Sequence, residues 1–312
     1  MSSELIKNAA STRRSDPSPF QKAAIRERRL KLLLWGDYAV GKTTLALQFP
    51  RPAVIDLEGG TNHYGGSFDF DVLPATTPGE VVAAVQWLLD HEHPYTSLVL
   101  DPISPLWEAM QRHWSEVFLR RNPASKGHKI EYYDLQPRDW QVIKAELKHL
   151  VRMLHALDMN VIVTAREKPR YAESGFMQKV GETFDAERSL PYMFDTVVRL
   201  TVDEKGRRVA HTLKDRTNKL PKTPWLLDYA VFEECFGRDT LGRAAVRAER
   251  IREDQLARLK DLIASLEMPD DQVRKRLPEY GATTLDELSA ANADLIISKL
   301  DAARAANTNI GG

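Results

Sequence analysis

The chain contains almost no cysteine and no long apolar run, and these absences exclude several classes of protein. Cys235 is the single cysteine among 312 residues, so an internal disulfide is excluded and an oxidising compartment is not indicated. No segment approaches the roughly 18 to 20 apolar residues that cross a bilayer, and the polar amino terminus lacks an apolar signal segment. We therefore expect a cytoplasmic protein without a membrane partner.

Positive charge is missing from part of the chain although the total charge is balanced. The sequence has 44 Lys and Arg against 44 Asp and Glu, so its overall charge does not indicate a polyanionic partner. Residues 53–108 contain no Lys or Arg, whereas residues 1–30 contain seven of them and only three acidic residues. The polar composition and weak periodicity of residues 1–28 predict a flexible basic arm.

Short apolar runs alternate with amphipathic segments between residues 29 and 248. Parallel strands need long crossovers, which are usually helices, so this alternation is typical of a parallel sheet. It predicts an α/β domain with a mostly parallel central sheet flanked by helices. The main helices are expected at 43–49, 78–89, from 104 and from 137, and the strands at 30–35, 53–57, 96–101, 161–164, 196–201 and 209–213.

The pattern changes at residue 249, after which strand signals end. Apolar residues recur at helical spacing within residues 251–266, 270–276, 285–289 and 291–305. Such spacing is more typical of a small core than of a ligand site. We predict a small helical module over residues 249–312.

A complete phosphate-binding loop lies between the first predicted strand and the first predicted helix. Its two glycines let the backbone curl so that N–H groups face phosphates, while Lys42 reaches the β- and γ-phosphates of a nucleotide. Thr43 is the expected Mg²⁺ ligand. We predict ATP and Mg²⁺ as cofactors, bound by Gly36, Asp37, Tyr38, Ala39, Val40, Gly41, Lys42, Thr43 and Thr44.

Two carboxylates follow later strands and are candidates to complete this site. Asp101 ends an apolar strand and is expected to hold Mg²⁺ through water. Many P-loop ATPases carry a Glu directly after this Asp, but here that position is Pro102. Glu58 follows the second strand, which we expect to lie close to the first, and it is the predicted base or water-orienting group.

These motifs resemble the RecA-like ATPases in their order and spacing. The resemblance rests on residues 36–44, 55–58 and 98–104 and covers residues 29–247. More closely, the set is similar to phage-type AAA ATPases of recombination modules, the Sak-type single-strand annealing ATPases. That resemblance implies ATP hydrolysis coupled to single-stranded DNA, a ring or filament of identical subunits, and a bacterial cytoplasm as the setting. A single-strand-binding protein or another recombination partner is also implied.

Residues 212–221 are similar to the Lys-x-Arg element of RecA-like and DnaB-like motors. In that family such cations reach the γ-phosphate of a neighbouring subunit. The resemblance therefore assigns Arg216 as an arginine finger and Lys214 as its assistant. A solvated basic loop or a DNA-contacting patch would show the same residues. RecA carries a sensing Gln after its fourth strand, where this chain has Thr164 and Arg166 nearby, so the sensor stays open.

Two segments mix cations with aromatic residues, as surfaces that contact single-stranded nucleic acid do. We predict both as loops at the strand ends, one over residues 120–133 and one over residues 167–182. Solvated surface loops of an unrelated NTPase would have the same composition. The DNA-contact candidates are Arg120, Arg121, Lys129, Lys168, Arg170, Tyr171 and Lys179.

Three functions are compatible with these motifs. The resemblance favours a DNA-dependent ATPase of recombination or strand annealing. A helicase-type or packaging-type motor would use the same finger but normally brings further translocation domains. A nucleotide or small-molecule kinase would need an Arg-rich lid near an acceptor pocket, and Glu58 at a strand end argues against it.

Overall fold

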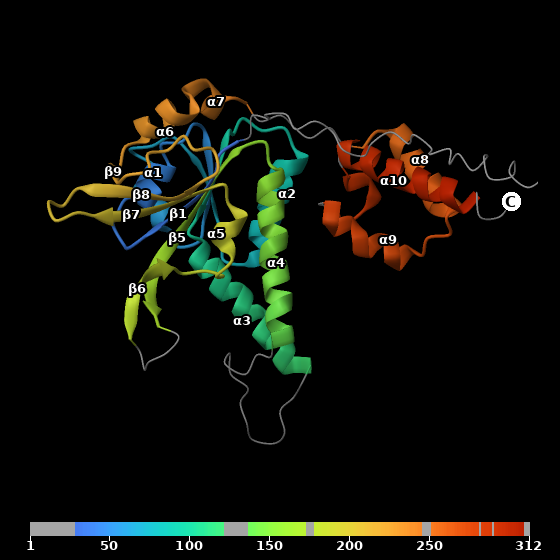
Figure 1. Cartoon of the computed structure of the whole chain (residues 1–312), viewed down its shortest axis with the longest axis horizontal. Helices are drawn as coiled ribbons and strands as arrows, with labels where there is room; N and C mark the ends of the chain where they lie inside the picture. Colours follow the sequence, from blue (N-terminus) through green and yellow to red (C-terminus); the bar gives the residue numbers. More distant parts are fainter. Residues whose placement is uncertain are drawn as a thin grey trace, which may run out of the picture.

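The computed structural model describes residues 29–121, 137–172, 178–244, 251–280, 282–288 and 290–308. Within them a sheet of nine strands forms the centre of the larger part of the chain (Figure 1). The predicted amino-terminal arm, residues 1–28, lies outside the described residues. The strands are β1 Lys31–Gly36, β2 Pro52–Asp56, β3 Asp71–Pro74, β4 Ser97–Asp101, β5 Asn160–Tyr171, β6 Lys179–Phe184, β7 Thr196–Val202, β8 Arg208–Asp215 and β9 Trp225–Leu226.

The sheet is parallel through its centre and antiparallel at one side. Its order is β3-β2-β4-β5-β1-β7-β8-β9, and only the pairings of β7 with β8 and β8 with β9 are antiparallel along this path. All residues of β1 and β4 are buried, as expected of strands covered on both faces. The predicted α/β class with a mostly parallel sheet is confirmed.

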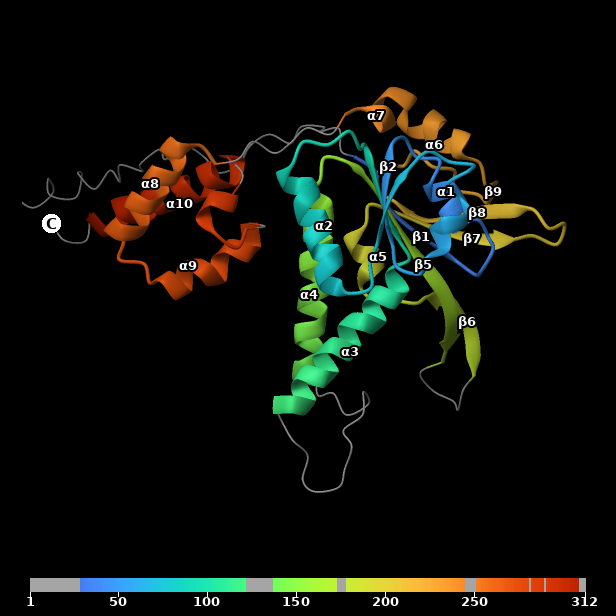
Figure 2. The same cartoon turned by 180° about the vertical axis from the view of Figure 1, so that it is seen from behind.

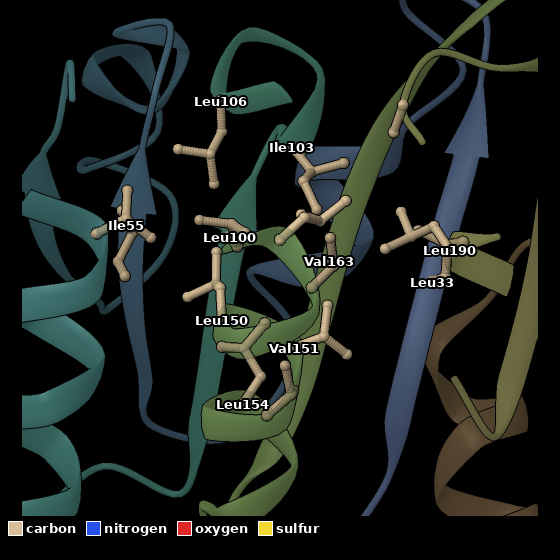
Figure 3. Close-up of a cluster of buried hydrophobic side chains, with 14 of the residues drawn as sticks. Leu33, Ile55, Leu100, Ile103, Leu106, Leu150, Val151, Leu154, Val163 and Leu190 are labelled. Atoms are coloured by element: carbon tan, nitrogen blue, oxygen red, sulfur yellow. The ribbon is translucent and has the colours of Figure 1, made fainter. Parts of the chain in front are cut away.

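Helices cover both faces of the sheet, and consecutive β1 side chains enter two different cores. Leu33 packs with residues of α2, α3 and α4, whereas Leu32 packs with residues of α1 and α6. Figure 3 shows the first of these clusters, in which Leu100 and Val163 lie near Leu150 of α4. The helices of this part are α1 Lys42–Ala46, α2 Pro78–Asp90, α3 Ile103–Arg121, α4 Pro137–Ala156, α5 Leu190–Met193, α6 Tyr229–Phe236 and α7 Arg238–Gly242.

The segment predicted as a loop over residues 167–182 is largely a β-hairpin. Strand β5 continues beyond the buried residues of the sheet to Tyr171, and β6 returns antiparallel to it. Figures 1 and 2 show this β5–β6 hairpin projecting away from the central sheet. The prediction failed because exposed strand residues have no apolar alternation to reveal them. Hydrogen bonding between the two strands supports the extended backbone instead.

A second position also differs from the prediction. Strand β2 does not lie close to β1, because β4 and β5 are inserted between them. Sequence order gave no indication of this crossover. Glu58 nevertheless reaches the same edge of the sheet, because parallel strands end at one edge.

Residues 251–308 form helices with an apolar cluster of their own. The helices are α8 Glu253–Ser265, α9 Asp270–Arg276 and α10 Ala290–Thr308, with short 3-10 turns at Leu277–Tyr280 and Leu285–Glu287. Leu259, Leu277 and Leu288 form the buried centre of this cluster. Among the described helices of the whole chain, none has the length and apolar character needed to cross a membrane.

Candidate nucleotide site

The phosphate-binding loop joins β1 to α1 at the carboxyl edge of the sheet. Gly36 ends β1 so close to β7 that a Cβ there would lie 2.4 Å from the Leu200 carbonyl oxygen. Gly41 is the N-cap of α1 and has a φ of 97°, a left-handed conformation that favours glycine. Both glycines of the motif are therefore required by the local backbone. Their spacing leaves the loop's N–H groups at the amino end of a helix, a location suited to anions.

Lys42 extends back over the loop that precedes it. Its ammonium donates to the Gly36 carbonyl at 3.0 Å and to the Asp37 carbonyl at 2.6 Å. Burial lowers the pKa of Lys42, while the carboxylates of Asp101 and Asp37 oppose that shift. The cation is thus held within the loop by acceptors that a phosphate can replace.

Thr43 and Asp101 meet at the base of the loop. The Thr43 hydroxyl donates to Asp101 Oδ2 at 2.6 Å, and the Thr164 hydroxyl donates to Asp101 Oδ1. Burial raises the pKa of Asp101, and the two hydroxyl hydrogen bonds act in the opposite direction. A buried carboxylate beside a hydroxyl is an oxygen ligand pair that suits Mg²⁺, so these residues fit the implied cation. Among the described residues, no cluster of three or more His, Cys, Asp or Glu could hold a metal.

Asp56 builds the turn that presents Glu58. Its carboxylate accepts hydrogen bonds from the backbone N–H groups of Glu58, Gly59 and Thr61, at 2.8 to 2.9 Å. Burial tends to raise the pKa of Asp56, but these bonds and the Thr61 hydroxyl outweigh it and the pKa is lowered. An ionised Asp56 therefore fixes the backbone around Glu58. This role of Asp56 was not predicted from the sequence.

Glu58 forms an ion pair with Arg166, which follows the buried part of β5. The Arg166 guanidinium donates to Glu58 Oε1 through Nε at 2.6 Å and through Nη2 at 2.5 Å. Both side chains are partly exposed, with 35% of Glu58 and 47% of Arg166 accessible. Of the two sensor candidates, Thr164 is buried against Asp101 and Arg166 contacts the predicted base.

The Lys-x-Arg pair lies at the opposite edge of the sheet. Asp215 pairs with Thr196 at the start of β7, and Thr196 in turn pairs with Leu32 near the start of β1. Lys214 donates to the carbonyls of Pro191, Tyr192 and Phe194 at 2.5 to 3.3 Å. Its ammonium therefore has three acceptors within its own chain. Arg216 is 60% exposed and pairs with Asp195 at 3.0 Å. Neither cation is brought to its own phosphate-binding loop.

The DNA-contact candidates fall into two groups. Lys168, Arg170, Tyr171 and Lys179 lie on the β5–β6 hairpin and are exposed. Lys168 pairs with Asp185 at 2.7 Å, and Lys179 pairs with Glu182 at 2.5 Å. The loop predicted over residues 120–133 is wrong at Arg120 and Arg121, because α3 continues to Arg121, and its other residues, including Lys129, lie outside the described residues. The hairpin therefore presents a mixed surface whose basic residues are partly neutralised.

Comparison with known proteins identifies the family. A family model described as an AAA domain matches residues 28–219, more than half of the chain. The chain belongs to this AAA-domain family. Its matched region contains the phosphate-binding loop, Asp101, Glu58 and Arg216. No curated protein matches the chain.

The chain is also similar to solved structures of other proteins. The chain is similar to a structure titled "Crystal structure of the RadB recombinase", with 20% sequence identity and a TM-score of 0.39. The alignment covers 64% of this chain and 88% of that one. The AAA-domain match and the observed phosphate-binding loop establish a P-loop nucleotide-binding fold.

Proposed function

We propose that this chain binds ATP with Mg²⁺ and hydrolyses it as a RecA-like ATPase acting on DNA. The observation that carries the proposal is the cluster at the carboxyl edge of the sheet. There the Lys42 ammonium, the paired Thr43 hydroxyl and Asp101 carboxylate, and the Glu58 carboxylate converge from three different strand ends. This combination supplies a phosphate cradle, a metal site and a base at one place.

Each residue of this cluster has a separate role in the proposed transfer of the γ-phosphoryl group to water. The loop N–H groups and Lys42 hold the phosphate chain, and Thr43 with Asp101 would hold Mg²⁺. When bound, Mg²⁺ neutralises charge on the β- and γ-phosphate oxygens. Glu58 accepts a hydrogen bond from the attacking water and orients it in line with the bond to the leaving phosphate. The Arg166 guanidinium donates to Glu58 Oε1 and so holds this carboxylate at the carboxyl edge of the sheet.

Homo-oligomerisation is part of the proposal because of where Arg216 lies. Since β8 is antiparallel to β7, its final residues are at the edge of the sheet opposite the phosphate-binding loop. An Arg216 that acts on a nucleotide must therefore act on the nucleotide of another subunit. Its exposure of 60% leaves the guanidinium accessible for such a contact. Lys214, held by carbonyls of the α5 region, would position this segment.

Single-stranded DNA is the proposed activating ligand. The β5–β6 hairpin continues from β5, the same strand that carries Thr164 and Arg166 into the nucleotide site. Its exposed Arg170 and Tyr171 combine a phosphate ligand with a stacking ring. Through this strand, binding on the hairpin could be coupled to the Glu58–Arg166 pair. By resemblance, the process served is phage recombination or strand annealing with a single-strand-binding protein or other recombination partner.

Two other functions share the nucleotide site. A helicase-type or packaging-type motor would also use Arg216 between subunits. A nucleotide or small-molecule kinase would transfer the phosphate to an acceptor other than water. Glu58 at the carboxyl edge favours water as the acceptor, and the position of Arg216 favours a shared site, so both observations support a hydrolase over a kinase.

The decisive experiment measures ATP turnover with and without single-stranded DNA over a range of salt concentrations. We expect DNA to stimulate turnover and its binding to weaken as salt rises, because phosphate contacts release counterions. An ATP turnover rate that single-stranded DNA leaves unchanged at every salt concentration would contradict the proposed DNA-dependent ATPase. Phosphate transfer to an added nucleoside or small molecule would support the kinase.

Two variants test the assigned roles. Glu58→Gln should lower kcat on the order of 100-fold or more while ATP still binds, because the amide cannot accept the proton of water. Mixing inactive Arg216→Ala and Lys42→Ala subunits should restore part of the turnover if the finger acts between subunits. No recovery in the mixture would contradict the trans assignment of Arg216.

A further inference from the structure

Arg208 lies against the phosphate-binding loop although no motif includes it. A Cβ built on Gly41 would be 3.2 Å from Arg208 Cδ and 3.4 Å from Arg208 Nε. The Leu227 Cδ2 atom is 3.3 Å from the same point. The side chain of Arg208 therefore covers the last glycine of the loop, directly before Lys42.

The position of Arg208 follows from strand geometry. Arg208 begins β8, and the next residue on the same face of this strand, Ala210, is fully buried in the core that contains α1. Its backbone is fixed on both sides, because it pairs with Val202 of β7 and its carbonyl accepts the Leu227 N–H at 3.0 Å. A rigid antiparallel ladder thus delivers this guanidinium to the loop.

The neighbouring residue Arg207 has different surroundings from Arg208. Arg207 directly precedes β8 and points to the face of this strand opposite Arg208, where it lines a surface groove with Val209 and His211. Its guanidinium pairs with Asp203, at 2.8 Å from Nε and 2.7 Å from Nη2. Arg208 is exposed, and among the residues that the structure describes no carboxylate pairs with it. Two neighbouring arginines therefore differ in charge balance, and the unpaired one is at the nucleotide site.

We propose that Arg208 is a ligand of the nucleotide phosphate chain, supplied by the same subunit that supplies the loop. A guanidinium offers planar, paired donors that match phosphate oxygens, and its charge adds to the field of the loop N–H groups and Lys42. Arg208 holds the phosphates from the β8 side of the loop, and Lys42 holds them from within it. This inference rests on the proposed nucleotide binding and adds a second cation to it.

The test compares three variants by titration calorimetry with ATP, ADP, adenosine and inorganic tripolyphosphate. Arg208→Gln should weaken ATP, ADP and tripolyphosphate about 10-fold, the size expected for one charged hydrogen bond. Arg208→Lys should lose less, because it keeps the charge but not the planar donors. The matched control Arg207→Gln should bind all ligands as the wild type does. Circular dichroism of each variant checks that the fold is retained.

The outcomes separate the two proposals. If wild-type protein binds neither ATP nor tripolyphosphate, the proposed function itself fails. If it binds them and Arg208→Gln matches Arg207→Gln, Arg208 only packs on Gly41 and the inference is wrong. If Arg208→Gln weakens ATP but leaves tripolyphosphate unchanged, the contact is to the adenosine and the phosphate assignment is overturned.

Discussion

The two edges of the parallel sheet use cations in different ways. At the amino edge, Arg29 is 2% exposed and pairs with Asp158 at 3.0 Å, while it also donates to the carbonyls of Thr240 and Ala244. Nearby, the Lys31 ammonium donates to three carbonyls at the end of α4 at 2.8 to 3.0 Å. At the carboxyl edge, Lys42 has two loop carbonyls and Arg208 has no carboxylate partner among the described residues.

This difference separates cations that stabilise the fold from cations that are available to the proposed nucleotide. The amino-edge groups close contacts across more than 100 residues, from β1 to the α4–β5 connection and to α7. Removing one of them leaves buried acceptors without a donor, which is costly. At the carboxyl edge Lys42 contacts two loop carbonyls that a phosphate can replace, so its removal should affect the proposed ligand binding far more than stability.

The largest effect is expected from Lys42→Ala. The variant removes the cation that would contact the β- and γ-phosphates, so ATP turnover should fall on the order of 100-fold or more. Its melting temperature should stay close to that of the wild type, because the variant releases only two carbonyls, and one of them, of Asp37, lies in the exposed part of the loop. ATPase assays and thermal unfolding in the same buffer measure both. A loss of stability as large as that of Lys31→Met would break the proposed contrast between the edges.

Lys31→Met should have the opposite profile, with a large loss of stability. Near pH 9 the native Lys31 is a neutral amine, because burial lowers its pKa to about 7, and its two N–H groups can still donate to two of the carbonyls of Leu154, Leu157 and Met159. We expect their loss to cost about 2 kcal/mol at that pH. Nucleotide affinity should be retained in the folded fraction. Denaturant unfolding of the variant and the wild type provides the measurement.

The same variant makes a prediction about pH. Burial lowers the pKa of Lys31 from 10.5 to about 7, so between those values the unfolded chain binds more protons than the native one. Wild-type stability from this group therefore rises as pH increases from about 7 to 10.5, and Lys31→Met should lack that rise. The stability difference between the two proteins should be larger at pH 9 than at pH 6.5. A difference that is larger at the lower pH would mean that the ammonium is the stabilising form.

Sequence predicted the carboxyl edge better than the amino edge. The loop at Gly36–Thr44 has a fixed spacing, and Asp101 follows a recognisable apolar strand, so local pattern was sufficient for both. In the sequence Lys31 is only a polar residue within an apolar run. Its neighbours in the sequence do not indicate that the carbonyls at the end of α4 lie beside its side chain. Its role depends on a contact across 123 residues.

The same limit applies to the contact between Arg166 and Glu58, to Arg208 and to the order of the strands. Arg208 sits beside Arg207 in the sequence, and only the pleat of β8 distinguishes the residue that meets the loop from the one that meets Asp203. The insertion of β4 and β5 between β1 and β2 likewise has no local signal. Sequence pattern predicted Lys42, Thr43 and Asp101 as neighbours at this edge, whereas the contacts that bring Arg166 and Arg208 to them depend on tertiary packing.

A smaller effect is expected from Thr164→Val at the carboxyl edge. The variant removes a hydroxyl donor from the buried Asp101 carboxylate, and burial then raises the pKa of Asp101 further. The Mg²⁺ concentration needed for half-maximal turnover should rise about threefold to tenfold, and more at low pH, where protons compete with the metal. Thr201→Val, which removes a hydroxyl that contacts His211 instead, is the control. An unchanged Mg²⁺ requirement would contradict Asp101 as a metal ligand.

The smallest effect on stability is expected from Arg216→Ala, the exposed exception at the amino edge. Its ion pair with Asp195 is 60% exposed on the arginine side, so its loss should change the free energy of unfolding by less than about 0.5 kcal/mol. Lys214→Met should cost more, because the Lys214 ammonium donates to three carbonyls around α5. Denaturant unfolding of both variants measures this difference between two cations only two residues apart. An Arg216→Ala loss equal to that of Lys214→Met would place Arg216 among the residues that hold the fold, and would remove the structural reason to regard it as available to a neighbouring subunit.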